Sequence, residues 1–300
     1  MLSRTAFCSL KQVDELACLH IEHPKFFAEI CLQGSQLTQF EHRTKGAFLW
    51  LSPDAFYKNG RSVRGGIPVC WPWFGALNFN PGAVKQAVSS DLAHGFAREL
   101  NWSLENIHES VHGVRLTLTL SHSAETLKIW PHEFCLTCHM DLGDEIKIEL
   151  TTENLSKTAM ALSQALHTYL PTQDIHRTRL LGAGNGQYID ALDNWQLKQQ
   201  QGSIGFTEEV DRIYLGAYQY QILADNKHFA LNSNSQSSIV WNPWVNKSKR
   251  LAGFPANGYE QMFCIESANV LSDHLKLVPG QSHTLKMSLN CIDSGGDVHE

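Results

Sequence analysis

Residues 114–121 read Val-Arg-Leu-Thr-Leu-Thr-Leu-Ser, and this stretch decides the fold class. Its four apolar side chains alternate with four polar ones, which is the pattern of a β-strand with one buried face. The same alternation appears at residues 146–151 and 285–290. Strands that bury one face and expose the other are typical of antiparallel sheets, so the pattern predicts an all-β fold.

Turn-forming residues separate these strand-like stretches, as at Gly143-Asp144 and Pro279-Gly280. Stretches with helical periodicity are few, and the best helical candidate is residues 190–200. Many strands joined by short turns, with little helix, favour a single antiparallel sandwich.

The chain shows no Pro/Ser/Gly-rich linker, internal repeat or low-complexity tract. We therefore expect one domain over residues 1–293. Residues 294–300 are polar, and we expect them to form a frayed tail.

Composition restricts the classes of partner. The 300 residues are 43% hydrophobic and 18% charged, which suits a globular protein with a sizeable core. A formal net charge of −6 and a pI near 6.2 argue against nucleic acid as the main partner. A small phosphorylated substrate is compatible with this balance, because two or three well-placed arginines suffice to bind it.

The N-terminal residues 1–8 lack the apolar core and small-residue cleavage site of a secretory signal, and no apolar stretch is long enough to span a bilayer. We therefore expect a cytoplasmic protein without a membrane partner. In that compartment the eight cysteines are expected to be reduced and mostly packed as small apolar side chains.

Two motifs look functional but have simpler explanations. Residues 135–139 match the C-x-x-C-H spacing of covalent haem attachment, yet strand alternation places Cys135 and Cys138 on opposite faces of a sheet. The glycine-rich residues 182–186 lack the third glycine and the βαβ surroundings of a dinucleotide-binding loop. We expect a strand and a loop, respectively.

Residues 64–75 read RGGIPVCWPWFG and combine an arginine, two adjacent glycines, two prolines and three aromatic side chains. The glycines let the backbone turn sharply and bring the arginine close to a ligand. The aromatic side chains suit either a wall that stacks on a sugar or a structural loop packed under a sheet. Residues 94–98, HGFAR, again place polar side chains around a glycine.

Three ionisable residues lie in or next to apolar runs. His167 stands in ALHTYL at 165–170, Glu266 in FCIESANV at 263–270, and Asp211 precedes Arg212 in DRIY. A histidine among 15 is usually structural, and the glutamate could form a buried ion pair with an arginine. Glutamate nevertheless seldom enters an apolar strand without a partner or a function.

Taken together and in this order, these segments resemble the glucose-6-phosphate 1-epimerase branch of the aldose 1-epimerase (galactose mutarotase-like) superfamily. The segments that carry the resemblance span most of the chain: RGGIPVCWPWFG at 64–75, HGFAR at 94–98, ALHTYL at 165–170, DRIY at 211–214, VWNPW at 240–244 and FCIESANV at 263–270. The resemblance implies a single large antiparallel β-supersandwich that interconverts the anomers of a hexose 6-phosphate, D-glucose 6-phosphate first.

The resemblance also implies residue roles. His167 and Glu266 correspond to the catalytic pair. The residues that contact the sugar or its phosphate correspond to Arg64, His94, Arg98 and Asp211. The sequence departs from some members at Ala93 and Trp73, where those members carry glutamine, and both differences bear on hydroxyl or phosphate contacts.

The chemistry needs two proton carriers on opposite sides of the sugar's C1–O5 bond, and no cofactor or metal. His167 suits the acid because the ordinary pKa of histidine, near 6.5, permits proton exchange around neutrality. Glu266 suits the base if partial burial raises its pKa while a neighbouring cation keeps it ionised.

Three alternatives remain open from the sequence. The chain could bind carbohydrate without catalysis, since a fold does not determine a function. His94, His167 and Glu266 could instead hold a metal as a two-histidine, one-carboxylate site. The substrate could also be an unphosphorylated hexose. No stretch suggests an interface, so we expect a monomer.

Overall fold

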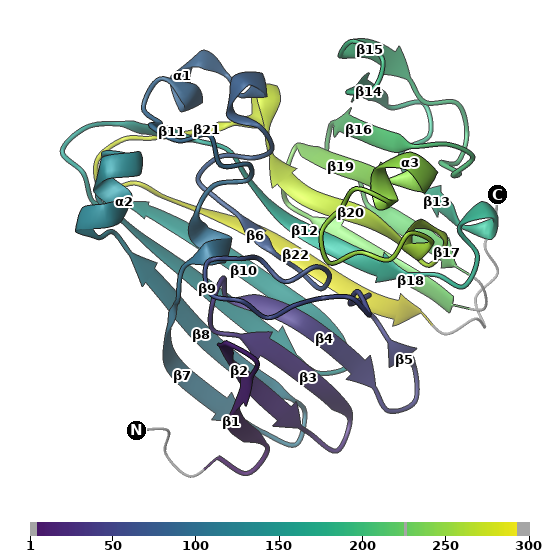
Figure 1. Ribbon diagram of the computed structural model, residues 1–300, viewed down its shortest axis with the longest axis horizontal. Coiled ribbons are helices and arrows are strands. Elements are labelled where there is room, and N and C mark those ends of the chain that lie inside the picture. Colours follow the sequence, from purple (N-terminus) through teal and green to yellow (C-terminus); the bar gives the residue numbers. More distant parts are fainter. Residues whose placement is uncertain (1–4, 225–226, 293–300) are drawn as a thin grey trace.

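The computed structural model describes residues 5–224 and 227–292, and almost all of its ordered elements are antiparallel strands (Figure 1). The strands form four sheets of eight, seven, five and two strands. This confirms the all-β antiparallel architecture. The expected frayed tail, residues 294–300, lies outside the described residues.

The eight-stranded sheet contains the stretches whose alternation predicted strands. In spatial order its strands are β13 (Arg179–Leu181), β17 (Tyr220–Ala224), β18 (Lys227–Ser233), β22 (Ser282–Ile292), β10 (Glu145–Asn154), β9 (Phe134–Leu142), β8 (Val114–Ser121) and β7 (Ser103–Glu109). Strand β8 coincides with the quoted stretch at 114–121, and its apolar side chains are buried while its polar ones are not.

The seven-stranded sheet carries the ALHTYL, DRIY and FCIESANV segments of the second half of the chain. Its strands, in spatial order, are β15 (Gln196–Gln199), β14 (Gln187–Asp190), β16 (Val210–Leu215), β19 (Ser237–Asn242), β20 (Met262–Asn269), β12 (Gln164–Pro171) and β6 (Val69–Cys70). Both faces of β19 and β20 are buried, so these strands do not alternate between apolar and polar residues.

The five-stranded sheet is N-terminal and lies beside the β7–β10 part of the eight-stranded sheet (Figure 1). Its strands, in order, are β1 (Cys8–Val13), β2 (Leu16–Glu22), β3 (Phe26–Cys31), β4 (Gln36–His42) and β5 (Gly46–Ala47). The two-stranded sheet pairs β11 (Met160–Leu162) with β21 (Leu275–Leu277).

Helices are short and lie in the connections. The α-helices are α1 (Gly82–Lys85), α2 (Ala124–Ile129) and α3 (Trp244–Ser248). The 3₁₀ turns are η1 (Leu77–Phe79), η2 (Ala97–Glu99), η3 (Ile175–Arg177), η4 (Gly258–Glu260) and η5 (Leu271–Asp273). Within the described residues, no helix has the length and apolar character needed to cross a membrane.

The helix expected at residues 190–200 is wrong, because this segment is the β14–β15 hairpin. Asn194 and Trp195 have φ angles of 50° and 59°, so the chain reverses there in a left-handed turn. The Asp190 carboxylate accepts hydrogen bonds from the Leu192 amide and the Lys198 ammonium, which hold the turn. Pairing of β14 with β16 then fixes the hairpin in the sheet.

The two motifs with simple explanations are structural, as expected. Cys135 and Cys138 lie on β9, with Cys138 fully buried and Cys135 partly exposed on the other face. Residues 182–186 form the turn between β13 and β14. Six of the eight cysteines are buried.

One apolar cluster extends from Cys8 to Leu289 and includes side chains of the eight-, seven- and five-stranded sheets. Its continuity supports a single domain over residues 1–293, which remains a prediction. A second cluster, with Trp50, Tyr169 and Trp241, covers the opposite face of the seven-stranded sheet. That opposite face carries the candidate site.

Gly66 brings the segment after Arg64 against β4. Its φ is 61°, its amide donates to the Trp50 carbonyl at 2.8 Å, and a Cβ atom at this position would overlap the Leu37 carbonyl oxygen. Replacement of Gly66 by alanine should therefore lower the free energy of unfolding by more than about 2 kcal/mol, from backbone strain plus overlap. Urea unfolding measures the change.

Gly82→Ala is the matched control, because the nearest atom to a Cβ there is the Gln86 side-chain nitrogen at 3.9 Å. We expect that variant to stay within about 1 kcal/mol of the wild type. Equal unfolding midpoints for the two variants would contradict the argument.

Candidate active site

His167 and Glu266 stand directly opposite each other on neighbouring antiparallel strands, β12 and β20. His167 Nε2 lies 3.4 Å from Glu266 Oε1, and both side chains are almost fully buried. Alternation along the strands places them on the same face as Tyr169 and Cys264, members of the second apolar cluster. The register of one strand pair therefore brings together two residues that are 99 positions apart.

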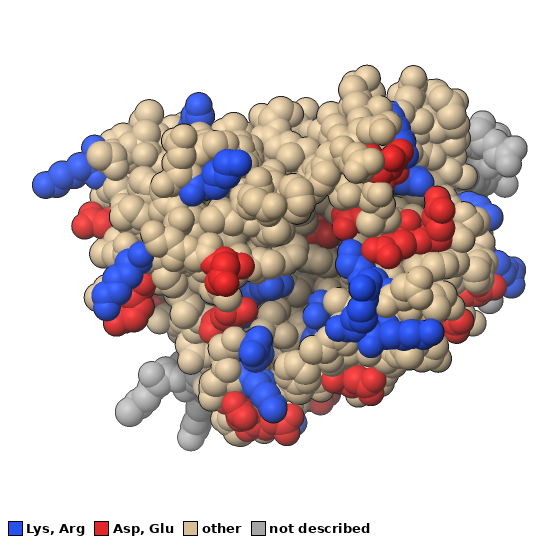
Figure 2. All heavy atoms as spheres, turned by 45° about the horizontal axis from the view of Figure 1, so that its top comes forward, with Lys and Arg blue, Asp and Glu red and all other residues tan. Residues whose placement is uncertain are grey.

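A cavity of about 370 Å³ opens over this face. His167, Glu266, Arg64, His94 and Asp211 all line it, so five of the six predicted site residues meet around one space. The side chains arrive from β12, β20, β16 and two loops of the first hundred residues. On the face shown in Figure 2, a hollow opens among interspersed acidic and basic side chains rather than in a uniformly basic surface.

Burial shifts the two opposed groups toward their neutral forms. It raises the pKa of the Glu266 carboxyl well above its ordinary value, with Asp211 adding to the rise and Arg98 opposing it. Burial also lowers the pKa of His167 to about 3, assisted by the Arg98 and Arg64 cations. The expectation of a histidine with an ordinary pKa is therefore wrong for the empty site, where His167 is a neutral imidazole.

Each member of the pair keeps one polar atom free. Within the described part of the chain, His167 Nδ1 and Glu266 Oε2 are buried and have no hydrogen-bond partner. Buried polar atoms without partners are costly to a fold, and in a cavity they mark where a ligand would bind. No arginine forms an ion pair with Glu266 among the described residues, so the structural explanation considered for this glutamate is not supported.

His94 is held in a defined tautomer. It has a φ of 66°, and its Nδ1 accepts a hydrogen bond from the Gly75 amide at 3.2 Å. Burial, with the Arg98 cation next, lowers its pKa well below the ordinary value, so the ring is neutral and its proton is on Nε2. The rings of His94 and His167 lie 5.9 Å apart, and His94 can donate to an oxygen beside His167.

Asp211 lies on β16, and burial raises the pKa of its carboxyl. Lys247 of α3, which sequence reasoning missed, stands 3.6 Å from Asp211 and 3.2 Å from Glu209. Its ammonium also lies 5.7 Å from the centre of the Trp241 ring. Lys247 follows closely after the VWNPW motif, and that proximity was the available signal.

A second hollow, of about 310 Å³, adjoins the first, since both are lined by His94, His167 and Arg64. Arg98 lines only this second hollow, together with Arg61, which sequence reasoning also missed. Three arginines therefore line the hollow that adjoins His167.

Two of these arginines, Arg64 and Arg98, donate hydrogen bonds to neighbouring protein groups. Arg64 Nη1 donates to the Tyr169 hydroxyl at 3.3 Å, and Arg98 Nη2 donates to the Ala93 carbonyl at 2.9 Å. Arg98 Nε is buried without a hydrogen-bond partner in the described residues. The contact with Arg98 at position 93 is thus made by the main chain, so it does not depend on the side chain that differs there.

Aromatic side chains of residues 64–75 divide between two roles. Trp71 and Trp73 are fully buried in the main core, where their indole nitrogens donate to Thr152 and to the Leu92 carbonyl. Phe74 lines the cavity. A sugar-stacking wall is therefore wrong for the two tryptophans.

Two aromatic residues that sequence reasoning missed meet at the cavity. Phe79 and Trp195 both line it and stack on each other with ring centres 4.5 Å apart. Phe79 is 49% exposed, so this pair forms part of the rim.

The geometry does not favour the metal-site alternative. Among the described residues, His94, His167 and Glu266 do not bring one ligand atom each to within 4.8 Å of one another; Cys18, Glu29 and Cys31 alone do so.

The aldose 1-epimerase family matches residues 17–290, nearly the whole chain. The chain belongs to the aldose 1-epimerase family. A relative from Escherichia coli, named "Putative glucose-6-phosphate 1-epimerase", is 35% identical over 265 residues, which are 87% of this chain and 85% of the relative. A relative of the same name from Haemophilus influenzae is 33% identical, over 80% and 79% of the two chains.

Solved structures agree with this membership. A mutarotase structure from Salmonella typhimurium, titled "putative mutarotase (YeaD)", aligns over 97% of this chain and 95% of its own with a TM-score of 0.87 and 29% identity. A second structure, of HI1317, aligns over 97% and 98% with a TM-score of 0.78 and 32% identity. The galactose mutarotase-like β-supersandwich and an epimerase activity are therefore confirmed for this aldose 1-epimerase.

The lowered pKa of His167 predicts how this residue's contribution to the free energy of unfolding depends on pH at acid pH. Between pH 6.5 and about 3 the unfolded chain binds a proton at this position and the folded chain does not. The contribution of His167 to the free energy of unfolding should therefore fall as pH drops through that window, by on the order of 1 kcal/mol per unit. His167→Asn should show a shallower fall, measured by urea unfolding at a series of pH values.

His112→Asn is the control, because His112 is exposed and lies away from the cavity. It should keep the wild-type slope. Identical slopes for the wild type and His167→Asn would contradict the assigned pKa direction.

Proposed function

We propose that this aldose 1-epimerase is a hexose-6-phosphate 1-epimerase that interconverts the α and β anomers of D-glucose 6-phosphate. One observation carries the proposal: His167 faces Glu266 across the cavity and also lines the adjoining hollow of Arg61, Arg64 and Arg98. The names of the Escherichia coli and Haemophilus influenzae relatives support the same substrate.

Ring opening needs one proton removed and one added. In the reactive form of the pair, the proton that burial favours on Glu266 has moved to His167. The Glu266 carboxylate then takes the proton from the C1 hydroxyl, the C1–O5 bond breaks as the C1 carbonyl forms, and O5 takes a proton from His167. Rotation about C1–C2 and closure on the other face of the carbonyl reverse these transfers and yield the second anomer. His94 donates from Nε2 to a substrate oxygen, and Asp211 accepts from sugar hydroxyls.

The arginines give the phosphate a second role besides binding. Arg98 and Arg64 are both among the causes that lower the pKa of His167. A phosphate dianion seated on Arg61, Arg64 and Arg98 offsets their charge, which removes the part of the lowering of the His167 pKa that Arg98 and Arg64 cause and leaves the larger part that burial causes. The phosphorylated sugar thereby favours protonation of His167 more than an unphosphorylated hexose does.

The chemistry is complete with the side chains of this chain, and we propose that no cofactor takes part. A monomeric state and a cytoplasmic location likewise stay predictions from the sequence.

Removal of either proton carrier should abolish most of the activity. His167→Asn and Glu266→Gln should each lower kcat/KM for anomer exchange by at least about 10²-fold, the usual contribution of a positioned acid or base. Exchange-spectroscopy NMR on glucose 6-phosphate measures both anomer fluxes directly. Glu260→Gln, an exposed glutamate bonded to the Tyr259 hydroxyl, should keep the wild-type rate. Near wild-type exchange by either site variant would overturn the assignment.

The preference for glucose 6-phosphate over glucose tests whether the arginine hollow binds the phosphate. The ratio of kcat/KM for glucose 6-phosphate over glucose should fall at least about tenfold in Arg98→Gln, because a charge-assisted contact worth roughly 1.5–3 kcal/mol is lost. Arg115→Gln, an exposed arginine on β8 that pairs with Asp141, should leave the ratio unchanged.

Inorganic phosphite should also accelerate exchange of free glucose by the wild type, since it can occupy the arginine hollow. A wild-type preference for free glucose or galactose would remove the phosphate from the proposal and keep the epimerase.

A further inference from the structure

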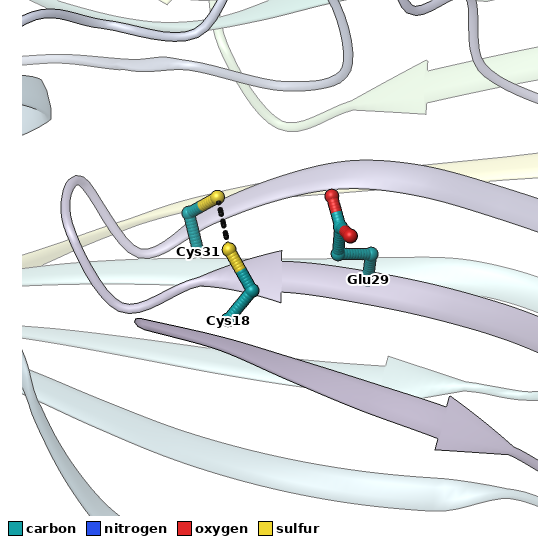
Figure 3. Close-up of side chains that lie close together, drawn as sticks. All are labelled: Cys18, Glu29 and Cys31. Carbon is teal, nitrogen blue, oxygen red and sulfur yellow. Dashed lines mark hydrogen bonds between the residues drawn. The ribbon is translucent and has the colours of Figure 1, made fainter. Parts of the chain in front are cut away.

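Four side chains with metal-ligating atoms share one face of the β2–β3 pair, away from the cavity. Cys18 and His20 project from β2, and Glu29 and Cys31 project from β3. The register pairs Cys18 with Cys31 and His20 with Glu29, so the four form two adjacent cross-strand pairs. Figure 3 shows the two sulfur atoms directed toward each other.

The hydrogen-bond pattern between β2 and β3 brings the side chains of these cross-strand pairs close together. The Leu32 amide donates to the Ala17 carbonyl at 2.9 Å, which makes Ala17–Leu32 a hydrogen-bonded pair. Hydrogen-bonded and non-hydrogen-bonded pairs alternate, so Cys18–Cys31 is non-hydrogen-bonded, the kind whose side chains lie nearer. The two sulfurs are 2.8 Å apart, and Cys18, Cys31 and Glu29 bring their ligand atoms to within 4.8 Å of one another.

Glu29 is held as a metal-binding carboxylate would be. It is only 3% exposed, and its Oε1 accepts hydrogen bonds from the Tyr57 and Thr38 hydroxyls, each at 2.7 Å. His20 Nε2 lies 2.9 Å from Oε2, but the contact is misaligned for an N–H donor, so this nitrogen has no hydrogen bond among the described residues. Neighbours that orient a carboxylate in this way are usual around metal ligands.

We propose that Cys18, Cys31 and Glu29 bind one thiophilic divalent cation, with zinc as the fitting ion. Two thiolates and one carboxylate are a ligand set that zinc accepts in tetrahedral geometry. Binding releases the two thiol protons and forms two S–Zn bonds and one O–Zn bond, without any change of oxidation state. The fourth position takes a water molecule or the ring of His20, whose Nε2 lies 2.9 Å from Glu29 Oε2.

The ion requires a small adjustment of the sulfurs. At Zn–S distances of about 2.3 Å, two thiolates on a tetrahedral ion stand roughly 3.7 Å apart, so the pair opens by about 1 Å. Rotation of the two cysteine side chains supplies this without moving the strands. Both cysteines are fully buried, which suits a structural ion acquired during folding.

The site would stabilise the segment that supplies the arginines. Tyr57 links Glu29 to residues 52–63, which cover this face of the five-stranded sheet. Gln33 Nε2 donates to the Arg61 carbonyl and Gln36 Nε2 to the Val63 carbonyl, each at 2.8 Å, and so fix the same segment just before Arg64. An ion under Tyr57 therefore tethers this segment to the β2–β3 pair.

Metal analysis of the whole protein, purified from zinc-supplemented cells without chelators, tests the proposal. We expect one zinc per chain, removal of it by a strong chelator with a drop in Tm, and recovery of the Tm on adding zinc back. Cobalt(II) added to the chelated protein should produce a thiolate-to-cobalt charge-transfer band. Absence of stoichiometric zinc together with absence of this band would overturn the site.

Cys18→Ser and Cys31→Ser should each lower zinc affinity at least about tenfold and lose most of the cobalt band. Glu29→Gln should lower zinc affinity by a similar factor but keep the band, because both thiolates remain. Cys138→Ser, a fully buried cysteine on β9 outside the cluster, is the matched control and should keep both. Circular dichroism of each variant separates loss of the site from loss of the fold.

The wild type also decides between a metal and a disulfide. An intact mass two hydrogens lower than that of the reduced chain, with both cysteines blocked to alkylation and no zinc, would show a Cys18–Cys31 disulfide and overturn the proposal. Zinc content, Tm, the cobalt band and intact mass are all measured without the reaction, so their outcome is independent of the epimerase assignment.

Discussion

The cross-strand opposition of His167 and Glu266 is the constraint around which this epimerase is arranged. Two ionisable groups are buried 3.4 Å apart on a face that otherwise packs apolar side chains. Burial favours the neutral form of both, and each keeps a buried atom without a partner in the described chain. Such a pair opposes stability in the empty protein, and the free atoms become useful only when a polar substrate fills the cavity.

Charge around the pair is arranged to respond to that substrate. The arginine hollow lies on one side, with Arg64 and Arg98 acting against protonation of His167. Lys247 lies close to both Glu209 and Asp211. Its positive charge therefore partly offsets the negative charge of the Asp211 carboxylate before a sugar binds. An anionic substrate is therefore the ligand that changes the state of the histidine most, because it offsets cations that a neutral sugar leaves in place.

The sequence predicted the fold class well because one-sided strands carry their own signal, as β8 does at residues 114–121. The central strands of the site do not alternate, since both their faces are buried, and only the family resemblance identified them. The hairpin at 190–200 was misassigned because left-handed backbone at Asn194 and Trp195 and pairing with β16 outweigh local propensity. The Phe79–Trp195 stack at the cavity and Arg61 at the second hollow were missed because tertiary contacts alone bring them there, whereas Lys247 had a weak signal in its proximity to the VWNPW motif.

The pKa of His167 shows why residue identity alone could not give the mechanism. A histidine in a strand motif was expected to titrate near neutrality, but the shift depends on burial and on two arginines that are 69 and 103 positions away in the sequence. One of them, Arg64, sits at the end of the segment that Glu29, Gln33 and Gln36 fix to the N-terminal sheet. Packing in the first third of the chain therefore positions part of the positive charge that His167 experiences, and that charge, together with burial, opposes protonation of the ring.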